Sequence, residues 1–179
     1  MELKKGKYRI EERGLNFNLS NDLDFKNSKS CFYFRGGNGF GKTSFLEKII
    51  IPGLKNENVP YIYIGQDMRT QLYTLRALLS VQGFKVSDND EIGLLKLWIS
   101  NRKSATVFIL DEFDKYFPDH GFIFDWTDSF IRTYIIVTHL GDSRPDFAPE
   151  EFKTVNVKFE LVDFNGRLKN VQVGKEEAW

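Results

Sequence analysis

The sequence contains a single cysteine, Cys31, among 179 residues, so it can form neither an internal disulfide nor a cysteine-based metal cluster. This usage fits a reducing compartment, and we expect Cys31 to be a small buried strand residue. Only five prolines are present, scattered along the chain. Because no Gly/Ser/Pro linker, internal repeat or low-complexity stretch interrupts the sequence, we predict one domain over residues 1–179.

Excess charge and long apolar runs are also lacking. The 25 Lys and Arg balance 25 Asp and Glu, so no global field draws the chain onto nucleic acid or anionic lipid. The longest apolar runs, such as Ile49–Ile51 and Ile135–Val137, are too short to cross a bilayer, and Met1–Arg13 is charged rather than signal-like. We therefore expect a cytoplasmic protein without membrane insertion.

The residues that are present predict an ordered α/β fold. Hydrophobic residues make up 41% of the chain, with 17 Phe. The expected strands are Ser30–Phe34, Tyr61–Ile64, Thr106–Leu110 and Tyr134–Val137, and the expected helices are Thr43–Ile51, Asp67–Val81, one opened by a capping box at Ser87 and Asp90, and Phe122–Ile131. We expect Pro52 and Gly53 to stop the first helix. This alternation predicts a mainly parallel sheet flanked by helices, with ligands at the carboxyl ends of its strands.

Antiparallel strands are expected at both ends of the chain. Tyr8–Phe25 alternates apolar and polar residues, as strands with one wet face do. Thr154–Val173 reads as a hairpin that turns at Asn165 and Gly166. The predicted fold is therefore an α/β P-loop NTPase with additional antiparallel strands from the N- and C-terminal ends.

A glycine-rich run follows the predicted strand Ser30–Phe34 and matches the pattern G-x-x-x-x-G-K-[ST]. The run with its following serine is Gly36, Gly37, Asn38, Gly39, Phe40, Gly41, Lys42, Thr43 and Ser44. Its backbone amides and the following helix N-terminus would face the phosphates of ATP or GTP. Lys42 would reach the β and γ phosphates, and the Thr43 hydroxyl would bind magnesium. We take all nine residues as the nucleotide-binding set.

Two acidic residues end the apolar strand Thr106–Leu110, at the edge of the sheet where a nucleotide would lie. This is the Walker B arrangement. Asp111 is expected to bind Mg²⁺, largely through water, and Glu112 to polarise the attacking water.

Two more polar residues follow predicted strands. The amide of Gln66, after Tyr61–Ile64, would touch both Mg²⁺ and the lytic water if that strand neighbours the P-loop strand. His139 follows Tyr134–Thr138 and would place an imidazole on the γ phosphate. We therefore assign Glu112, His139 and Gln66 as catalytic candidates, and Thr43, Asp111 and Gln66 as metal ligands.

The order of these motifs resembles that of the ATP-binding cassette (ABC) ATPases. The matching stretches run from the P-loop through Ile64-Gly65-Gln66 and Ile109-Leu110-Asp111-Glu112 to Ile136-Val137-Thr138-His139. The resemblance implies that Gln66 is the Q-loop glutamine and His139 the switch histidine. It also implies Mg²⁺ and ATP as cofactors, and a homo- or heterodimer with ATP between its two domains.

The chain departs from that family in several places. The stretches between Lys42 and Gln66, and between Gln66 and Asp111, are short for the subdomains of transporter cassettes. Where the family has its LSGGQ signature, this chain has Val86-Ser87-Asp88-Asn89-Asp90, whose acids would repel a phosphate. Phe113–Pro118 is closer to non-transport relatives that act in DNA repair or defence.

Several functions remain open from the sequence. The first is an ATPase that passes its nucleotide-driven association to a partner protein or to nucleic acid. The alternatives are a binding subunit with little hydrolysis of its own, the ATP-binding subunit of an ABC transporter, and a small kinase, although no Arg-rich lid is present. The absence of Asn-Lys-x-Asp favours ATP over GTP. Tyr8 and Phe17 are candidates to stack on adenine, with the core or a strand face as the alternative place for either ring.

Overall fold

The structure is a computed structural model of the whole chain, and it describes residues 1–25, 29–65, 68–83, 91–112, 127, 130–137 and 151–176. Its strands are β1 (Glu2–Leu3), β2 (Gly6–Ile10), β3 (Leu15–Leu19), β4 (Leu23–Asp24), β5 (Ser30–Arg35), β6 (Tyr61–Ile64), β7 (Val107–Asp111), β8 (Thr133–Val137), β9 (Lys153–Asn165) and β10 (Leu168–Lys175). Its helices are α1 (Lys42–Phe45), α2 (Ile51–Asn56), α3 (Met68–Val81) and α4 (Glu91–Ser100), with a 3-10 turn at Glu11–Arg13 and a π-helical turn at Leu46–Ile50.

Eight strands form one sheet in the order β2-β3-β10-β9-β5-β8-β7-β6, and β1 pairs antiparallel with β4. The run from β9 through β5, β8 and β7 to β6 is parallel. The hairpins β2-β3 and β9-β10 are antiparallel, and β3 joins β10 in parallel. The predicted fold class is confirmed: a mainly parallel sheet with helices, extended by antiparallel strands from both ends of the chain.

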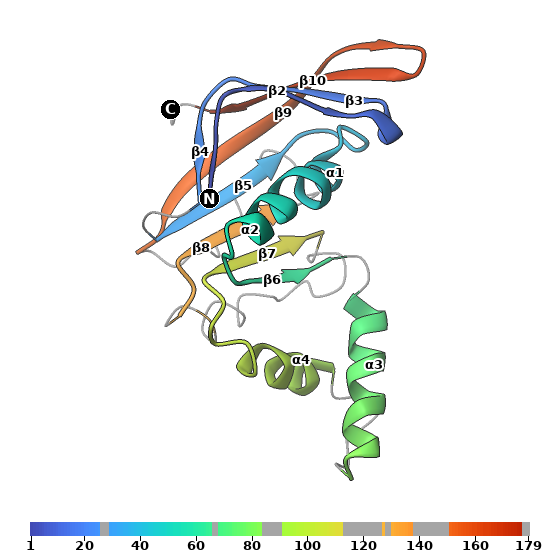
Figure 1. Cartoon of the computed structure of the whole chain (residues 1–179), viewed down its shortest axis with the longest axis vertical. Coiled ribbons are helices and arrows are strands. Elements are labelled where there is room, and N and C mark those ends of the chain that lie inside the picture. Colours follow the sequence, from blue (N-terminus) through green and yellow to red (C-terminus); the bar gives the residue numbers. More distant parts are fainter. Residues whose placement is uncertain are drawn as a thin grey trace.

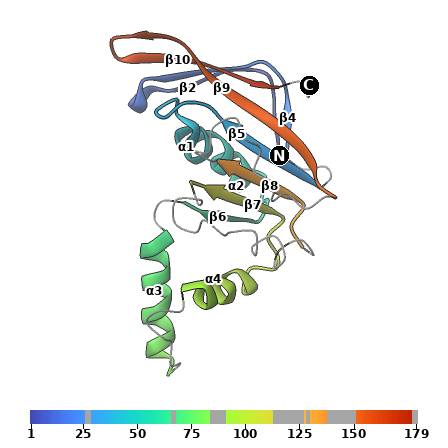
Figure 2. The same cartoon turned by 180° about the vertical axis from the view of Figure 1, so that it is seen from behind.

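The central strands are buried on both faces, because their alternate side chains enter two different hydrophobic clusters. Phe32 and Phe34 of β5 enter the cluster that also contains α1 and α2, whereas Cys31 and Tyr33 enter the one that contains α4. Cys31 is fully buried, as expected. In Figures 1 and 2, α1 and α2 lie between the central strands and the hairpin β2-β3, and α3 and α4 lie beyond β6.

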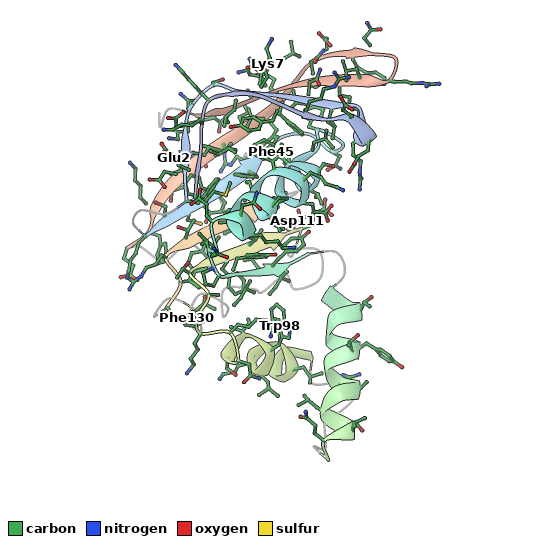
Figure 3. The ribbon with its side chains drawn as sticks, viewed as in Figure 1. Glu2, Lys7, Phe45, Trp98, Asp111 and Phe130 are labelled. Atoms are coloured by element: carbon green, nitrogen blue, oxygen red, sulfur yellow. The ribbon has the colours of Figure 1, made fainter. Side chains whose placement is uncertain are left out.

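Phe45 fixes the first helical turn against both hairpins. Its ring is fully buried and packs at centroid distances of 5.0 Å from Phe17, 6.2 Å from Phe34 and 5.4 Å from Phe159. These three rings come from β3, β5 and β9, and Figure 3 places Phe45 beneath the hairpin strands. The glycine-rich loop is therefore held between the central sheet and the strands contributed by both ends of the chain.

The prediction that Pro52 and Gly53 stop the first helix is wrong. The helix runs on through both residues to Asn56, with Pro52 in the first turn of α2. A π-helical turn at Leu46–Ile50 comes directly before it. A proline ring in a regular helix collides with the carbonyl four residues earlier, and the wider π turn changes the backbone at that point. The helix therefore absorbs the proline.

The other predicted elements lie close to their expected bounds. The C-terminal hairpin turns after Asn165, with Gly166 at φ 62. Helix α3 covers the expected range and is followed by Gly83 at φ 84. The predicted capping box at Ser87 and Asp90 lies outside the described residues, as does most of the predicted helix Phe122–Ile131, of which Phe130 and Ile131 form a turn into β8.

In the part of the chain that the structure describes, no helix is both long and apolar enough to span a membrane.

Candidate functional site

The glycine-rich loop joins the end of β5 to the start of α1, the position that its sequence pattern predicts. Gly36, Gly39 and Gly41 have φ values of 141, 76 and 82, which side chains rarely allow. A Cβ on Gly36 would overlap the carbonyl oxygen of Phe159, and one on Gly41 would lie 2.9 Å from the Phe17 ring. Glycine is therefore required at both ends of the loop, by backbone conformation and by close packing.

Lys42 lies at the N-terminus of α1 with its ammonium group inside the loop. Its Nζ donates to the carbonyl oxygens of Gly36 at 2.6 Å and Gly37 at 3.1 Å. The side chain is 6% exposed, which is rare for lysine. A buried positive charge beside a helix N-terminus favours a bound anion at the loop.

Thr43 and Asp111 meet at the carboxyl edge of the sheet. The Thr43 Oγ1 donates to Asp111 Oδ1 at 3.1 Å. Asp111 ends β7 on the side of the sheet that α1 covers, and Figure 3 shows it between β7 and that helix. The two oxygen groups expected to hold magnesium are thus brought together by the fold.

Asp111 is fully buried, and burial raises its pKa to about 6, although hydrogen bonds from Thr43 and Tyr63 favour its ionised form. The Tyr63 hydroxyl lies 3.2 Å from Asp111 Oδ2 and 3.4 Å from Glu47 Oε1. Burial and these two carboxylates raise the pKa of Tyr63, so the hydroxyl keeps its proton and can donate it to either one. Thr43 thus holds one carboxylate oxygen of Asp111, and Tyr63 holds the other.

Tyr63 was not among the predicted site residues. Alternation along Tyr61–Ile64 places its side chain on the α1 side of the sheet, because Ile62 and Ile64 enter the opposite cluster. The sequence contains that alternation, but the contact also needs β6 to pair with β7 in the observed register. Only the structure supplies the pairing.

Glu112 follows Asp111 with a left-handed backbone at φ 55, uncommon for a residue with a side chain. Its backbone N–H donates to the carbonyl oxygen of Val137 at the end of β8. The residue is 8% exposed and lines the cleft above the loop. The turn after β7 thus places a second carboxylate at the loop, as the sequence predicted.

A cleft of about 280 Å³ lies over the loop, near the lower end of ligand-pocket sizes, roughly 300 Å³. The predicted residues that line it are Asn38, Gly39, Gly41, Lys42, Thr43, Ser44 and Glu112. Arg13, Leu15 and Lys169 line it as well and were not predicted. These three come from the hairpins at the two ends of the chain, and no local motif marks them.

The oxygen groups present fit magnesium. Thr43 and Asp111 offer a hydroxyl and a carboxylate, the hard ligands that Mg²⁺ prefers, and Mg²⁺ takes its remaining ligands from water and phosphate. Among the described residues, no group of three or more His, Cys, Asp or Glu could hold a metal alone. Such a site would bind the metal together with a phosphate.

The catalytic candidates Gln66 and His139 lie outside the described residues, as does the segment Val86–Asp90. The role of Gln66 was predicted on the condition that the strand before it neighbours the P-loop strand, and that condition is wrong. Strand β6 does not neighbour β5 but forms the edge of the sheet, separated from β5 by β7 and β8. The proposed contact of Gln66 with Mg²⁺ therefore cannot rest on a strand that neighbours β5.

Neither aromatic proposed to stack on a base lines the loop cleft. Phe17 is 1% exposed and packs in the core against Phe45. Tyr8 is half-buried against the same cluster, and its hydroxyl donates to the Lys4 carbonyl oxygen. Phe17 therefore lies in the core and Tyr8 on a strand face against it, the alternative places considered for these rings.

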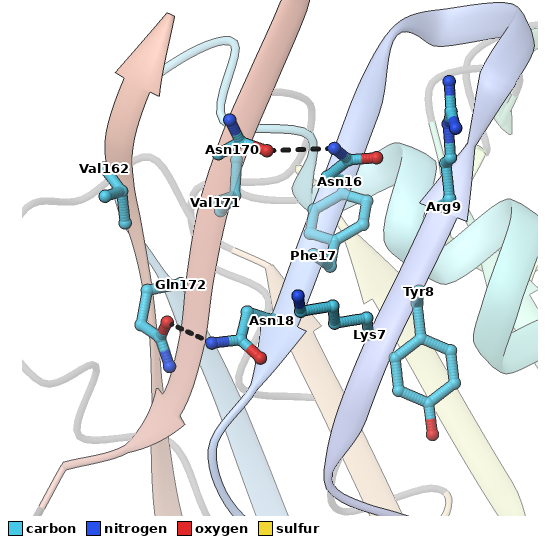
Figure 4. A pocket seen from close by; sticks show the side chains of 10 residues that line it. All are labelled: Lys7, Tyr8, Arg9, Asn16, Phe17, Asn18, Val162, Asn170, Val171 and Gln172. Atoms are coloured by element: carbon cyan, nitrogen blue, oxygen red, sulfur yellow. Dashed lines mark hydrogen bonds between the residues drawn. The ribbon is translucent and has the colours of Figure 1, made fainter.

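A second cleft, of about 420 Å³, lies on the outer face of β2, β3 and β10. Figure 4 shows its amide side chains in pairs, with Asn16 donating to Asn170 and Asn18 donating to Gln172, both at 2.9 Å. These amides bond to one another across the strands, and none of the predicted phosphate-loop residues lines this cleft, so the loop cleft is the candidate site.

No family model matches the chain, and no curated protein matches it. Among solved structures it is similar to the KaiC-like protein PH0186 from the hyperthermophilic archaeon Pyrococcus horikoshii OT3. The two share 15% identity over 82% of this chain and 79% of that chain, with a TM-score of 0.43. So distant a likeness leaves the function to be judged from the residues of the loop cleft.

Proposed function

We propose that this chain is a P-loop ATPase that binds ATP with Mg²⁺ in the loop cleft and hydrolyses it. The observation that carries the proposal is the contact between Thr43 and Asp111 beside the Lys42 ammonium. A loop of backbone amides, one buried cation and a hydroxyl paired with a carboxylate form a complementary environment for a polyphosphate and its metal.

Each residue has a distinct role in this proposal. The loop from Gly36 to Ser44 binds the phosphates, and Lys42 neutralises charge on the β and γ oxygens. Thr43 binds Mg²⁺ directly, and Asp111 holds it largely through water. Mg²⁺, when bound, withdraws charge from the phosphate oxygens during transfer. Glu112, next to the metal ligand and inside the cleft, accepts a proton from the attacking water.

The finer features of the proposal rest on the resemblance to ABC ATPases. We propose that Gln66 and His139 sense the γ phosphate and that two chains associate with ATP between them. Nucleotide-driven association is then passed to a partner protein or to nucleic acid. A single domain over residues 1–179 and a cytoplasmic location complete this proposal.

Steady-state hydrolysis of ATP with Mg²⁺ tests the proposal, measured over a range of concentrations of the purified chain. Lys42→Ala should abolish binding, whereas Glu112→Gln should bind ATP and lose at least about a hundredfold in turnover, as expected when a general base is removed. Glu160→Gln, an exposed carboxylate on β9, is the matched control and should leave turnover unchanged. Turnover that survives in Glu112→Gln would exclude Glu112 as the base.

The association is tested separately by light scattering of Glu112→Gln with and without ATP. A change from monomer mass to dimer mass on adding ATP and Mg²⁺ supports ATP held between two chains. ATP that binds without turnover or dimerisation in the wild type would instead indicate a binding subunit that needs a different partner.

A further inference from the structure

Lys169 connects the three segments that meet at the mouth of the loop cleft. Its backbone N–H donates to the Gly14 carbonyl oxygen at 2.8 Å, in the turn between β2 and β3. Its Nζ donates to the carbonyl oxygen of Gly39 at 2.9 Å, although 130 residues separate the two in sequence. One residue of the C-terminal hairpin is thus anchored on the N-terminal hairpin and reaches into the phosphate loop.

The Lys169 ammonium is placed for an anionic ligand. A carbonyl oxygen is a neutral acceptor, and a phosphate oxygen makes a shorter and stronger bond to an ammonium group. Within the described part of the chain, no carboxylate forms an ion pair with Lys169. The Phe164 ring lies 5.9 Å from the Nζ, on the hairpin strand beside it. Among the described residues, the ammonium is therefore held by a carbonyl oxygen of the loop and not by a salt bridge.

Arg13 brings a second cation to the same cleft. It ends the 3-10 turn Glu11–Arg13, and Gly14 follows at φ 58. A Cβ on Gly14 would overlap the carbonyl oxygen of Arg167, so the turn is packed directly against the C-terminal hairpin. Glu12 in the same turn forms a 2.6 Å ion pair with Lys48 on the loop helix. The turn that carries Arg13 is thus held on both sides, by the C-terminal hairpin and by Lys48.

We infer that Lys169 and Arg13 bind the phosphate chain of the nucleotide held by the loop, from the hairpin strands that line the mouth of the cleft. The inference rests on the proposed function and extends it to two hairpins that carry no nucleotide motif. Both cations belong to the same chain as the loop, so the contact needs no second subunit. Nucleotide binding would exchange the Gly39 contact of Lys169 for a phosphate contact. The position of the β9-β10 hairpin would then depend on whether the cleft holds a nucleotide.

The test uses the full chain and two probes, a fluorescent ATP analogue and inorganic tripolyphosphate as its competitor. Lys169→Met keeps the aliphatic stem and the backbone contact to Gly14 but removes the charge. We expect it to weaken both probes by about tenfold, the effect of one charge-assisted hydrogen bond. Lys169→Arg should retain most of the affinity, and Arg13→Met should weaken both probes in the same way.

Lys175→Met is the matched control, because Lys175 is an exposed lysine on the same strand, away from the cleft lining. It should bind both probes like the wild type. Thermal unfolding of each variant separates a binding loss from a folding loss. Wild-type affinity in Lys169→Met, or a loss for the ATP analogue without a loss for tripolyphosphate, would overturn the inference. Failure of the wild type to bind ATP would overturn the proposed function instead.

Discussion

Thr43 Oγ1 and Asp111 Oδ1 lie 3.1 Å apart, although 68 residues separate them in sequence. The contact joins the first turn of α1, which follows β5, to the last residue of β7, and in the sheet β8 lies between β5 and β7. Its two oxygen groups belong to the predicted metal site, so the geometry of that site depends on the order of the central strands.

The buried carboxyl of Asp111 should make stability fall as the pH rises from about 4 to 6. Its pKa is about 6 in the folded chain, against 3.8 for an ordinary aspartate. The folded state therefore binds more protons than the unfolded state in this window, and its ionised form costs on the order of 2 to 3 kcal/mol above pH 6. Asp111→Asn should remove this dependence and be more stable than the wild type at pH 7.5.

Denaturant unfolding of both proteins between pH 4 and pH 7.5 measures the effect. The wild-type free energy of unfolding should converge toward that of Asp111→Asn as the pH falls. Parallel curves for the two proteins would show that Asp111 carries no such cost.

Magnesium should reverse the pH preference of the site. Mg²⁺ binds the ionised carboxylate, so the metal-dependent stabilisation by ATP requires Asp111 without its proton. The rise in melting temperature with ATP and Mg²⁺ over ATP with EDTA should be larger at pH 7.5 than at pH 5. An Asp111→Asn chain should show little metal-dependent rise at either pH. Equal rises at both pH values in the wild type would contradict a metal bound by Asp111.

Tyr63→Phe should destabilise the chain by about 1 to 2 kcal/mol at pH 7.5, because it removes a hydrogen-bond donor from a buried carboxylate. The cost should be smaller at pH 5, where Asp111 is largely protonated. Tyr61→Phe is a control on the same strand, since the Tyr61 ring packs against the same cluster. Urea unfolding of the two variants should differ at pH 7.5, and equal losses would remove the assigned role of the Tyr63 hydroxyl.

Gly36→Ala should cost about 2 kcal/mol more than Gly6→Ala. Both glycines have a strongly positive φ, 141 and 154, so the backbone strain is comparable. A Cβ on Gly6 meets nothing within 4 Å, whereas one on Gly36 overlaps the Phe159 carbonyl. The difference in the free energy of unfolding isolates that close approach. No difference would mean that β9 can move away from the loop.

Phe45→Ala should cost about 3 to 5 kcal/mol, since it removes a fully buried ring that contacts aromatics on three strands. The exposed Tyr73 on α3, 74% accessible, is the matched aromatic control, and its change to alanine should stay within about 0.5 kcal/mol. Thermal and denaturant unfolding report both. A small loss for Phe45→Ala would indicate that the loop helix is not anchored by this cluster.

The local parts of the site could be predicted from the sequence. The glycine pattern, the strand before it and the helix after it are encoded within one short segment, as are the acids at the end of the strand Thr106–Leu110. Periodicity also predicted antiparallel strands near the N-terminal end, and the Asn165-Gly166 turn predicted the C-terminal hairpin. These features depend on neighbouring residues, whose side chains decide them directly.

The parts that depend on strand order could not be predicted. Placing Gln66 near the metal assumed that β6 neighbours β5, but β7 and β8 lie between them. Tyr63 and Lys169 reach the site through the pairing of β6 with β7 and of β10 with β3, which periodicity does not specify. Pro52 and Gly53 were expected to stop the first helix because proline and glycine commonly end helices. The π-helical turn that precedes Pro52 leaves no simple signature in the residues.

The parallel pairing of β3 with β10 has a consequence for the order in which the chain can fold. The hairpin β2-β3 precedes the other strands of the large sheet in sequence, but it joins them through β10. During synthesis it must wait until residues 168–175 have left the ribosome, and the intervening strands can assemble before then. Late arrival of a pairing with such high sequence separation slows folding. The two terminal hairpins would therefore pair over the phosphate loop last. Arg13 and Lys169 would reach the loop cleft only in that final step.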